Sequence, residues 1–226
     1  MNALEPCPLC TATDCRTLET RGTPYPYRIC PRCRLIWLHP DGRPDPAAEK
    51  AHYDTHENDP SDPRYRAFLS RLTDPLMRRL PPGARGLDYG AGPGPTVSVM
   101  LGEAGFEVTD YDPFYRPDGN ALARRYDFIT CTETAEHFCD PRAEFRRLDG
   151  LLRPGGWLGV MTGFPPEEEK DFGGWPYRRD PTHVCFYGPE TMAFIARHFG
   201  YALEIPRRNV ALFYKPADTG PSSTPA

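Results

Sequence analysis

The chain has 226 residues, more than one modest domain needs and fewer than two full domains, so we expect one main domain with a small accessory unit. Its 27 basic and 31 acidic residues give a net charge of -4, which argues against a nonspecific nucleic-acid binder. No apolar run approaches the roughly 20 residues that span a bilayer, and no signal-peptide pattern opens the sequence. These features predict a cytoplasmic protein with no membrane partner.

Two C-x-x-C pairs lie near the start of the chain, Cys7 with Cys10 and Cys30 with Cys33. In a reducing compartment this spacing is typical of a structural zinc site, because each turn offers two thiolates and two turns complete a tetrahedral shell. A redox-active pair is the weaker alternative, since the motif occurs twice without thioredoxin-like surroundings. Residues 1–40 are therefore predicted to form a small zinc-ribbon-like unit that the metal holds together.

The purpose of this unit stays open among docking of nucleic acid, binding of protein and shaping of a substrate site. Arg28, Arg32 and Arg34 flank the second pair, where they could contact phosphate or form a solvated face. Cys15 could replace one ligand, although no second cysteine lies at the matching spacing.

Residues 41–83 combine a polar, proline-rich linker with two helices, a short one at 47–53 and one from Tyr65 to Leu80 that packs on the next domain. Residues 84–215 alternate apolar strands with helices, which predicts an α/β domain with a mostly parallel sheet and a final antiparallel hairpin. Residues 216–226 are predicted to be a disordered tail. The predicted strands are 86–89, 107–111, 126–130, 157–161, 202–205 and 210–214, and the predicted helices are 96–104, 119–125, 142–152 and 189–198.

A glycine-rich loop follows the first of these strands in the segment GLDYGAGPGP. Asp88 ends the strand, Gly90, Gly92 and Gly94 form the loop, and Asp112 ends the next strand. The glycines allow a tight turn and close approach of the backbone to a ligand, and the second carboxylate is placed for ribose hydroxyls. The dinucleotide pattern G-x-G-x-x-G fails here, because Pro95 and Thr96 follow the third glycine.

The order D-x-G-x-G-x-G resembles motif I of the class I methyltransferases that use S-adenosyl-L-methionine. The segment YDFITCTETAEHF resembles the fourth strand and following loop of that superfamily, and LLRPGGWLGVMT its fifth strand. This resemblance implies a Rossmann-like fold, with Asp88 and the three glycines at the methionine moiety and Asp112 at the ribose. Only fourteen residues separate Asp112 from Asp127, so the third strand is expected to be short or missing, and no adenine contact can be named.

Candidate catalytic residues follow the fourth and fifth strands. The element Glu133-Thr134-Ala135-Glu136-His137, with His183 further on, resembles the divalent-metal site of small-RNA 2'-O-methyltransferases and ubiquinone-biosynthesis O-methyltransferases. That resemblance implies a second, divalent metal held by Glu133, Glu136, His137 and His183, where it would lower the pKa of an acceptor hydroxyl. Many class I methyltransferases carry a similar pair without metal, and His183 would then be the general base.

The loop 163–188 is expected to cover the acceptor, either as a lid packed on the core or as an enclosure for a ring or sugar with an anionic group. In the linker, His52, His56 and Asn58 could also reach the site. The loop residues considered for this role are Phe172, Trp175, Tyr177, Arg178, Arg179, Asp180, Phe186 and Tyr187.

The leading hypothesis is methyl transfer from S-adenosylmethionine to an oxygen, nitrogen or carbon of a small molecule. One alternative is an RNA or protein methyltransferase that docks its substrate through the zinc unit. A noncatalytic zinc-ribbon adaptor is the other, and the intact loop and Asp112 argue against it.

Overall fold

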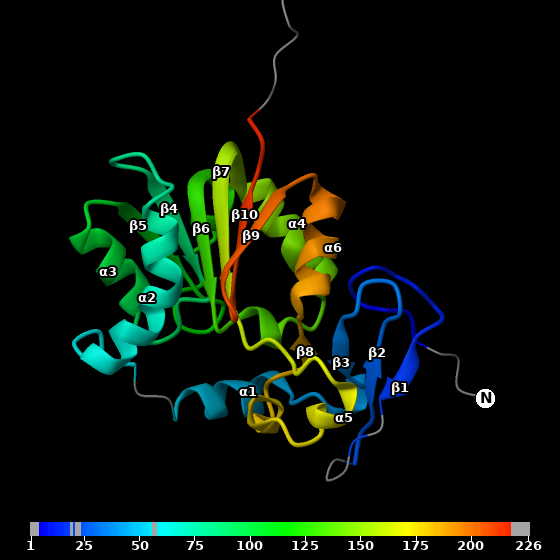
Figure 1. Cartoon of the computed structure of the whole chain (residues 1–226). Coiled ribbons are helices and arrows are strands. Elements are labelled where there is room, and N and C mark those ends of the chain that lie inside the picture. The colour runs from blue at the N-terminus through cyan, green and yellow to red at the C-terminus, as the bar shows by residue number, and fades with distance from the viewer. Residues whose placement is uncertain (1–4, 19, 21–23, 56–57, 218–226) are drawn as a thin grey trace, which may run out of the picture.

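The computed structural model describes residues 5–18, 20, 24–55 and 58–217. At its centre is a six-stranded sheet in which the first four strands are parallel and the last two form an antiparallel hairpin (Figure 1). This confirms the predicted Rossmann-like sheet. In spatial order the strands are β5 (Glu107–Tyr111), β4 (Arg85–Tyr89), β6 (Tyr126–Thr132), β7 (Leu152–Met161), β10 (Val210–Tyr214) and β9 (Ala202–Arg207).

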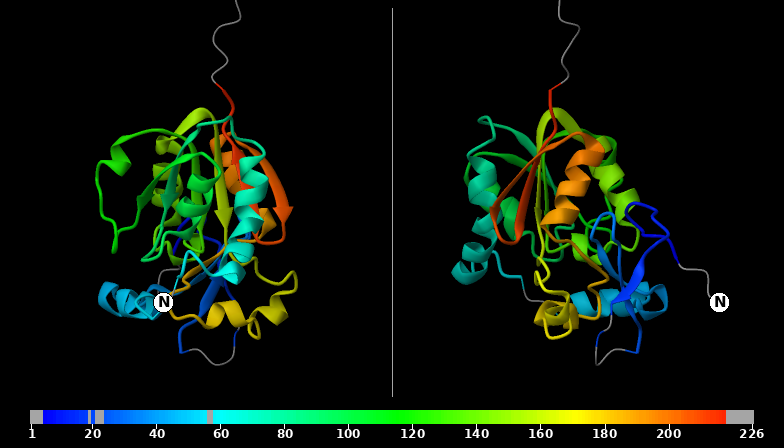
Figure 2. Two further views of the ribbon diagram at one scale, coloured as in Figure 1. Left: turned by 90° about the vertical axis from the view of Figure 1, so that its left-hand side faces the viewer. Right: turned by 45° about the vertical axis from the view of Figure 1, so that its right-hand side comes forward.

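Helices cover both faces of the sheet, as Figures 1 and 2 show. On one face lie α2 (Pro63–Met77) and α3 (Thr96–Glu103), and on the other α4 (Pro141–Leu151) and α6 (Pro189–Phe199). Successive residues of a strand point to opposite faces of the sheet. Phe128 packs in the hydrophobic cluster with α2 and α3, and its neighbour Ile129 packs in the hydrophobic cluster with α4 and α6. This period of two makes each strand bury both of its sides.

Asp-Pro pairs begin three of the helices. Asp45, Asp62 and Asp140 each accept hydrogen bonds from backbone N–H groups of the first turn, and a proline follows each of them. The carboxylate satisfies N–H groups that have no partner within the helix, and proline lacks an N–H that would need one. Some of the 28 prolines of the chain thus have a structural reason, because they occupy the first position of a helix.

The segment between β5 and β6 contains a single 3-10 turn, η2 (Ala121–Ala123), in place of the predicted helix 119–125. Within the part of the chain that the structure describes, no third strand lies beside β5, which is therefore the edge of the sheet. The sequence predicted a third strand that is short or missing, and among the described residues it is missing. Loop residues 112–115, which follow β5, consequently form part of the wall of the cavity described below.

A second, antiparallel sheet contains β1 (Arg16–Leu18), β2 (Tyr27–Ile29) and β3 (Ile36–Leu38). Its fourth strand is β8 (Cys185–Phe186), which comes from the segment after β7. The sequence predicted a separate unit at 1–40 and a continuous loop at 163–188, and here the structure differs. A two-residue strand has too short an apolar pattern to be identified from sequence.

Two helical segments lie below the carboxyl ends of the central strands in Figure 1, α1 (Pro46–Tyr53) and the short α5 (Glu169–Phe172). Most of the predicted tail, together with His56 of the linker, falls outside the described residues. Among the residues that are described, no helix combines the length and apolar character needed to cross a bilayer.

Candidate active site

A cavity of about 680 Å³ opens at the carboxyl ends of β4, β5 and β6. Its wall includes every residue that the sequence assigned to the cofactor and to catalysis, so segments far apart in the chain meet at one place. These residues are Asp88, Gly90, Gly92, Gly94, Asp112, Glu133, Glu136, His137 and His183. The volume falls in the range that small-molecule sites occupy.

The glycines of the loop are required by its geometry. Gly90 has a φ of +84°, and a Cβ atom there would lie 2.3 Å from the side chain of Thr134. At Gly94 a Cβ atom would lie 2.1 Å from the backbone oxygen of Asn58. No side chain fits at either position without movement of its neighbours. The loop is thus shaped for close approach of a ligand to its backbone.

Asp88 lies beneath this loop with its carboxyl group buried. Thr130 donates a hydrogen bond of 2.7 Å to Asp88 Oδ1. Burial raises the pKa of Asp88 to about 7, the Thr130 hydroxyl opposes this, and the nearby charges of Asp110 and Asp112 add to it. A cationic group of a ligand would favour the ionised form of this carboxyl group.

Asp112 accepts three backbone hydrogen bonds. Gly92 N–H donates to its Oδ2 at 2.9 Å, and Phe114 and Tyr115 N–H donate to its Oδ1 at 2.8 and 3.0 Å. A carboxylate offers about four acceptor positions, so one is left for a ribose hydroxyl. Asp112 therefore ties the glycine loop to the end of β5 and still suits the predicted role.

Three side chains of the cavity wall meet at one place: Glu136, His137 and His183. Their ligand atoms all lie within 4.8 Å of one another. Glu136 Oε1 is 3.9 Å from His137 Nε2 and 4.0 Å from His183 Nε2. Glu136 is fully buried, and its burial raises the pKa of this carboxyl group.

Backbone carbonyls orient both imidazoles. His137 Nδ1 donates to the oxygen of Thr182 at 2.9 Å, and His183 Nδ1 donates to the oxygen of Tyr177 at 2.7 Å. A carbonyl can only accept, so in the neutral rings the proton is on Nδ1 and Nε2 carries the lone pair. Burial lowers the pKa of His183, which favours its neutral form, although Glu136 opposes the shift.

Glu133 lies outside this group of three. Its backbone has a φ of +47°, a left-handed conformation unusual for glutamate, which places strain at the cavity wall. Tyr177 Oη donates to Glu136 Oε1 at 2.5 Å and also lies 3.1 Å from Glu133 Oε2. Burial and the neighbouring Glu136 raise the pKa of Glu133 to about 8. The predicted set of four ligands is thus three convergent groups and one nearby carboxyl group.

The cavity is acidic. Among its described lining residues, Arg147 is the only arginine or lysine, and it forms hydrogen bonds with Glu144 and the hydroxyl of Tyr89. Glu49 and Asp180 add further carboxyl groups to the wall. This charge favours a cationic ligand over an anionic one.

Of the two alternatives predicted for the aromatic residues of 163–188, packing on the core agrees with the structure and an enclosure around a ligand does not. Phe172 and Phe186 are fully buried, and their ring centroids lie 5.1 and 5.9 Å from that of Tyr27 in the small sheet. Arg178 donates to the carbonyl of Gly173 and lies over the ring of Tyr27. Of this segment only Asp180 and His183 line the cavity, so the prediction of an anion site there is not supported.

Helix α1 contributes residues that the sequence argument missed. Glu49 and Tyr53 line the cavity, and the ring of Tyr53 packs 5.1 Å from that of His137. His52 of the same helix, which the sequence had suggested for the site, lies with its Nε2 3.0 Å from Asp180 Oδ2. Glu49 and Tyr53 are four residues apart, the spacing that places two side chains on one face of a helix, but nothing in the sequence indicated where that face would lie.

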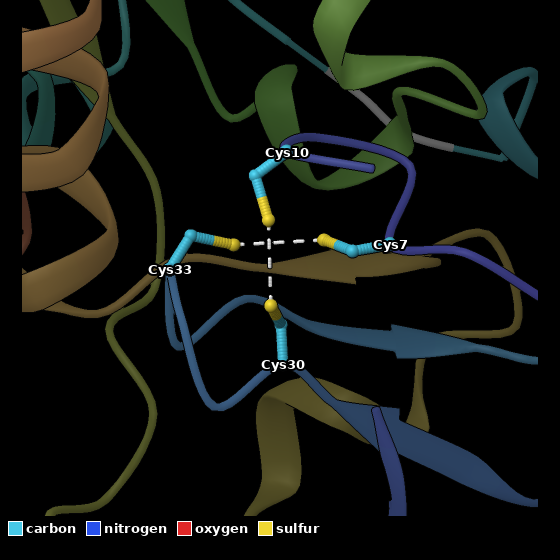
Figure 3. A group of neighbouring side chains, drawn as sticks. All are labelled: Cys7, Cys10, Cys30 and Cys33. Carbon is cyan, nitrogen blue, oxygen red and sulfur yellow. Dashed lines mark hydrogen bonds between the residues drawn. The ribbon is translucent and has the colours of Figure 1, made fainter. Parts of the chain in front are cut away.

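The four predicted zinc ligands converge on one point, as Figure 3 shows. Cys7 Sγ lies 3.5 Å from Cys33 Sγ, and Cys10 Sγ lies 3.4 Å from Cys30 Sγ. Four thiolates about 2.3 Å from a zinc ion would be roughly 3.8 Å apart, so the cluster fits tetrahedral zinc after a small expansion. Cys15, which is also buried, lies outside this group.

Both C-x-x-C turns have the same backbone geometry. Thr11 N–H donates to Cys7 O and Arg34 N–H to Cys30 O, each at 2.9 Å, and Thr11 and Arg34 have φ values of 61° and 60°. The repeated turn presents two thiols on one side, which suits a shared metal and not a redox pair.

The arginines beside the second turn are mostly engaged within the protein. Arg28 is buried and donates to Cys15 O, and Arg34 pairs with Glu169 at 3.0 Å. Arg32 is exposed beside the ring of Phe194. The row of phosphate-binding arginines considered from the sequence is therefore not present.

A family model described as a methyltransferase domain matches residues 61–204, more than half of the chain. The chain belongs to this methyltransferase family. A structure from Methanococcus maripaludis, assigned to the S-adenosyl-L-methionine-dependent methyltransferases, aligns with a TM-score of 0.52 at 14% identity, covering 78% of this chain and 95% of that chain. The methyltransferase thus has the class I fold.

Two curated relatives of the methyltransferase are named ubiquinone biosynthesis O-methyltransferase. The one from Serratia proteamaculans (strain 568) is 35% identical over 77 residues, 34% of this chain and 32% of the relative. The one from Bordetella avium (strain 197N) is 31% identical over 104 residues, 35% of this chain and 43% of the relative. The methyltransferase therefore matches less than half the length of these relatives.

Proposed function

We propose that this enzyme transfers the methyl group of S-adenosylmethionine to a hydroxyl oxygen of a small molecule, and that His183 accepts the hydroxyl proton. One observation carries the proposal: Glu136, His137 and His183 converge in the same cavity as the glycine loop. The names of the curated relatives favour oxygen over nitrogen or carbon. The acidic wall and the cavity volume favour a small acceptor that is neutral or cationic where it enters.

When bound, S-adenosylmethionine supplies a methyl group on a sulfonium, the electrophile of an in-line displacement. The residues of this chain align the partners and move one proton. His183 Nε2 is the accepting atom, since its Nδ1 proton is held by the carbonyl of Tyr177. His183 Nε2 would take the O–H proton of the acceptor as that oxygen takes up the methyl group, which would leave the cofactor as a neutral thioether.

Nearby carboxylates stabilise the imidazolium that results. Glu136 Oε1 lies 4.0 Å and Asp180 Oδ2 lies 3.9 Å from His183 Nε2. Burial acts to raise the pKa of Asp180, but hydrogen bonds from Thr182, the electrostatic interaction with His183 and a hydrogen bond from His52 bring the pKa to about 2, so this group is ionised at neutral pH. The pair of carboxyl groups would favour proton uptake at His183 in the transition state.

A second candidate mechanism uses a divalent metal at Glu136, His137 and His183. Two imidazole nitrogens whose Nδ1 atoms are anchored to carbonyls, with one carboxylate, are a donor set that suits first-row transition metals. Glu133 would stand beside this set without coordinating. When bound, the ion would act as a Lewis acid on the acceptor oxygen.

Calorimetry with S-adenosylmethionine on the zinc-loaded protein tests the cofactor, and absence of binding would refute the enzyme mechanism. Metal analysis after dialysis against Mn²⁺ or Co²⁺ separates the two mechanisms. One zinc per chain supports the general base, whereas a second ion that is lost in His137→Ala supports the metal. Incubation of cell extracts with methyl-labelled cofactor identifies the acceptor, and label found only in RNA or protein would contradict the proposed substrate class.

A further inference from the structure

The four-cysteine unit and the segment that carries His183 share one sheet. Strand β3 pairs with β8, with Ile36 opposite Phe186 and Trp37 opposite Cys185. Leu38 N–H also donates to the oxygen of Val184 at 2.9 Å. Through these contacts the small sheet is hydrogen-bonded to the residue that directly follows His183.

The other side of the same segment is bonded to the loop after β6. Val184 N–H donates to the oxygen of Glu136 at 2.8 Å, and the oxygen of Thr182 accepts from His137 Nδ1 at 2.9 Å. Residues 182–184 thus run between β3 and the Glu136–His137 turn. The position of His183 relative to Glu136 depends on both neighbours.

Side-chain packing reinforces this arrangement from the side of the small sheet. Trp37 and Phe186 are almost fully buried, and Tyr27 packs against Phe186 with ring centroids 5.9 Å apart. Tyr27 Oη also donates to the oxygen of Arg178, five residues before His183. The ring next to His183 is that of Tyr177, at 4.2 Å, whose own carbonyl fixes His183 Nδ1.

We infer that the four-cysteine unit is a positioning element for His183: β3 holds β8 in place, and β8 sets the imidazole against Glu136. Loss of zinc from the cysteines would then lower the rate of transfer to the acceptor and have little effect on the affinity for the cofactor. The reason is that the glycine loop belongs to β4, α3 and β5. The inference rests on the proposed function in one respect, that His183 faces the acceptor.

Two pairs of variants of the full chain test this inference. Leu38→Pro removes the N–H that bonds to Val184, whereas Leu38→Ala keeps that N–H and loses only the side chain. Cys7→Ser removes one predicted zinc ligand, and Cys15→Ser is its matched control, a buried cysteine outside the group of four. Two measurements follow for each protein: the ¹⁵N signals of the His183 imidazole near pH 8, assigned with His183→Gln, and the dissociation constant for S-adenosylmethionine.

We expect the wild type, Leu38→Ala and Cys15→Ser to show the single Nδ1–H tautomer of His183. In Leu38→Pro and Cys7→Ser the signals should move toward the mixture of tautomers of a free imidazole. Cofactor affinity should change by less than about twofold, and turnover of an identified acceptor should fall by about a hundredfold, as expected for a displaced catalytic group.

Unchanged His183 signals in both Leu38→Pro and Cys7→Ser would overturn the inference. So would a parallel loss of cofactor affinity, because the unit would then stabilise the whole domain without selectively positioning His183. Failure of the proposed function is distinguishable from either result, since it would appear as absent cofactor binding in the wild type while the tautomer comparison still holds.

Discussion

The carboxyl group of Asp88 is fully buried beneath the glycine loop, and burial raises its pKa to about 7. In an unfolded chain an aspartate has a pKa of about 3.9. Because the folded value is the higher one, folding takes up a proton between the two values. The buried carboxylate therefore lowers stability progressively as the pH rises from about 4 to about 7.

Asp88→Asn removes this pH-dependent cost. We expect the stability of the variant relative to wild type, without cofactor, to improve by roughly 3 kcal/mol between pH 4 and pH 8. Urea denaturation at the two pH values measures the difference. Asp74→Asn, an exposed position on α2, is the control and should show little change. A stability difference for Asp88→Asn that is independent of pH would contradict the prediction.

His183→Gln tests the proton acceptor directly. Glutamine retains a polar side chain of similar reach but cannot take up a proton near neutral pH. We expect kcat/KM for the acceptor to fall by about 10²–10⁴-fold, the usual contribution of a general base, with cofactor affinity unchanged. His198→Gln, an exposed position on α6, provides the control. A loss of less than about tenfold would argue against a role for His183 in proton transfer.

At the scale of elements, two glycines, one in the glycine loop and one in the helix that follows it, differ in the space available for a side chain. A Cβ at Gly94 would lie 2.1 Å from Asn58 O, whereas at Gly102 in α3 no heavy atom lies within 4 Å. Gly94→Ala should therefore cost about 1–3 kcal/mol and weaken cofactor binding about tenfold or more. Gly102→Ala should gain about 0.5–1 kcal/mol, because alanine is the better helix former.

Thermal unfolding and calorimetry of the two alanine variants check this pair. The comparison matters because both changes add one methyl group within the same loop and helix. Equal effects at the two positions would mean that close approach at Gly94 is not needed for folding or for the cofactor.

The main elements could be predicted from the sequence because their apolar patterns are long. Each of the six predicted strands corresponds to a strand of the central sheet, although β7 begins at Leu152, five residues before its predicted start, and the loop with Asp88 and Asp112 lies where the glycine spacing placed it. The pairing of β3 with β8 could not be predicted, since it joins residues about 150 positions apart through a strand of only two residues. Local patterns carry no information on such a contact.

In the candidate site, too, the sequence indicated which residues are involved but not how tertiary structure places them. The resemblance of the E-x-x-E-H element to a known metal site implied a common ligand set, but in this segment Ala135–His137 is the helical part, and Glu133 precedes that turn with a left-handed backbone. Its carboxyl group consequently points to Tyr177 and not to the imidazoles. The aromatic residues of 163–188 likewise had a composition suited to a binding site, and it was tertiary packing against Tyr27 that made them core.

At the scale of the whole molecule, the net charge of -4 is accompanied by a cavity in which carboxylates predominate. A cleft of one sign concentrates field lines and attracts ligands of the opposite charge. S-adenosylmethionine carries one more positive charge than S-adenosylhomocysteine, the product left after methyl transfer. The two ligands are otherwise nearly the same size, so their difference in binding reports the electrostatic contribution of the cavity.

Salt should therefore affect the two ligands unequally. Raising the ionic strength from about 0.01 M to 1 M shortens the screening length from about 30 Å to about 3 Å. We expect binding of S-adenosylmethionine to weaken about threefold more than binding of S-adenosylhomocysteine, measured by calorimetry at constant pH. Glu49→Gln, which neutralises a lining carboxylate on α1, should reduce this difference, and Glu204→Gln, on β9 away from the cavity, should preserve it. Identical salt dependence of the two ligands in the wild type would show that the acidic wall is screened by solvent and does not select for the methyl donor.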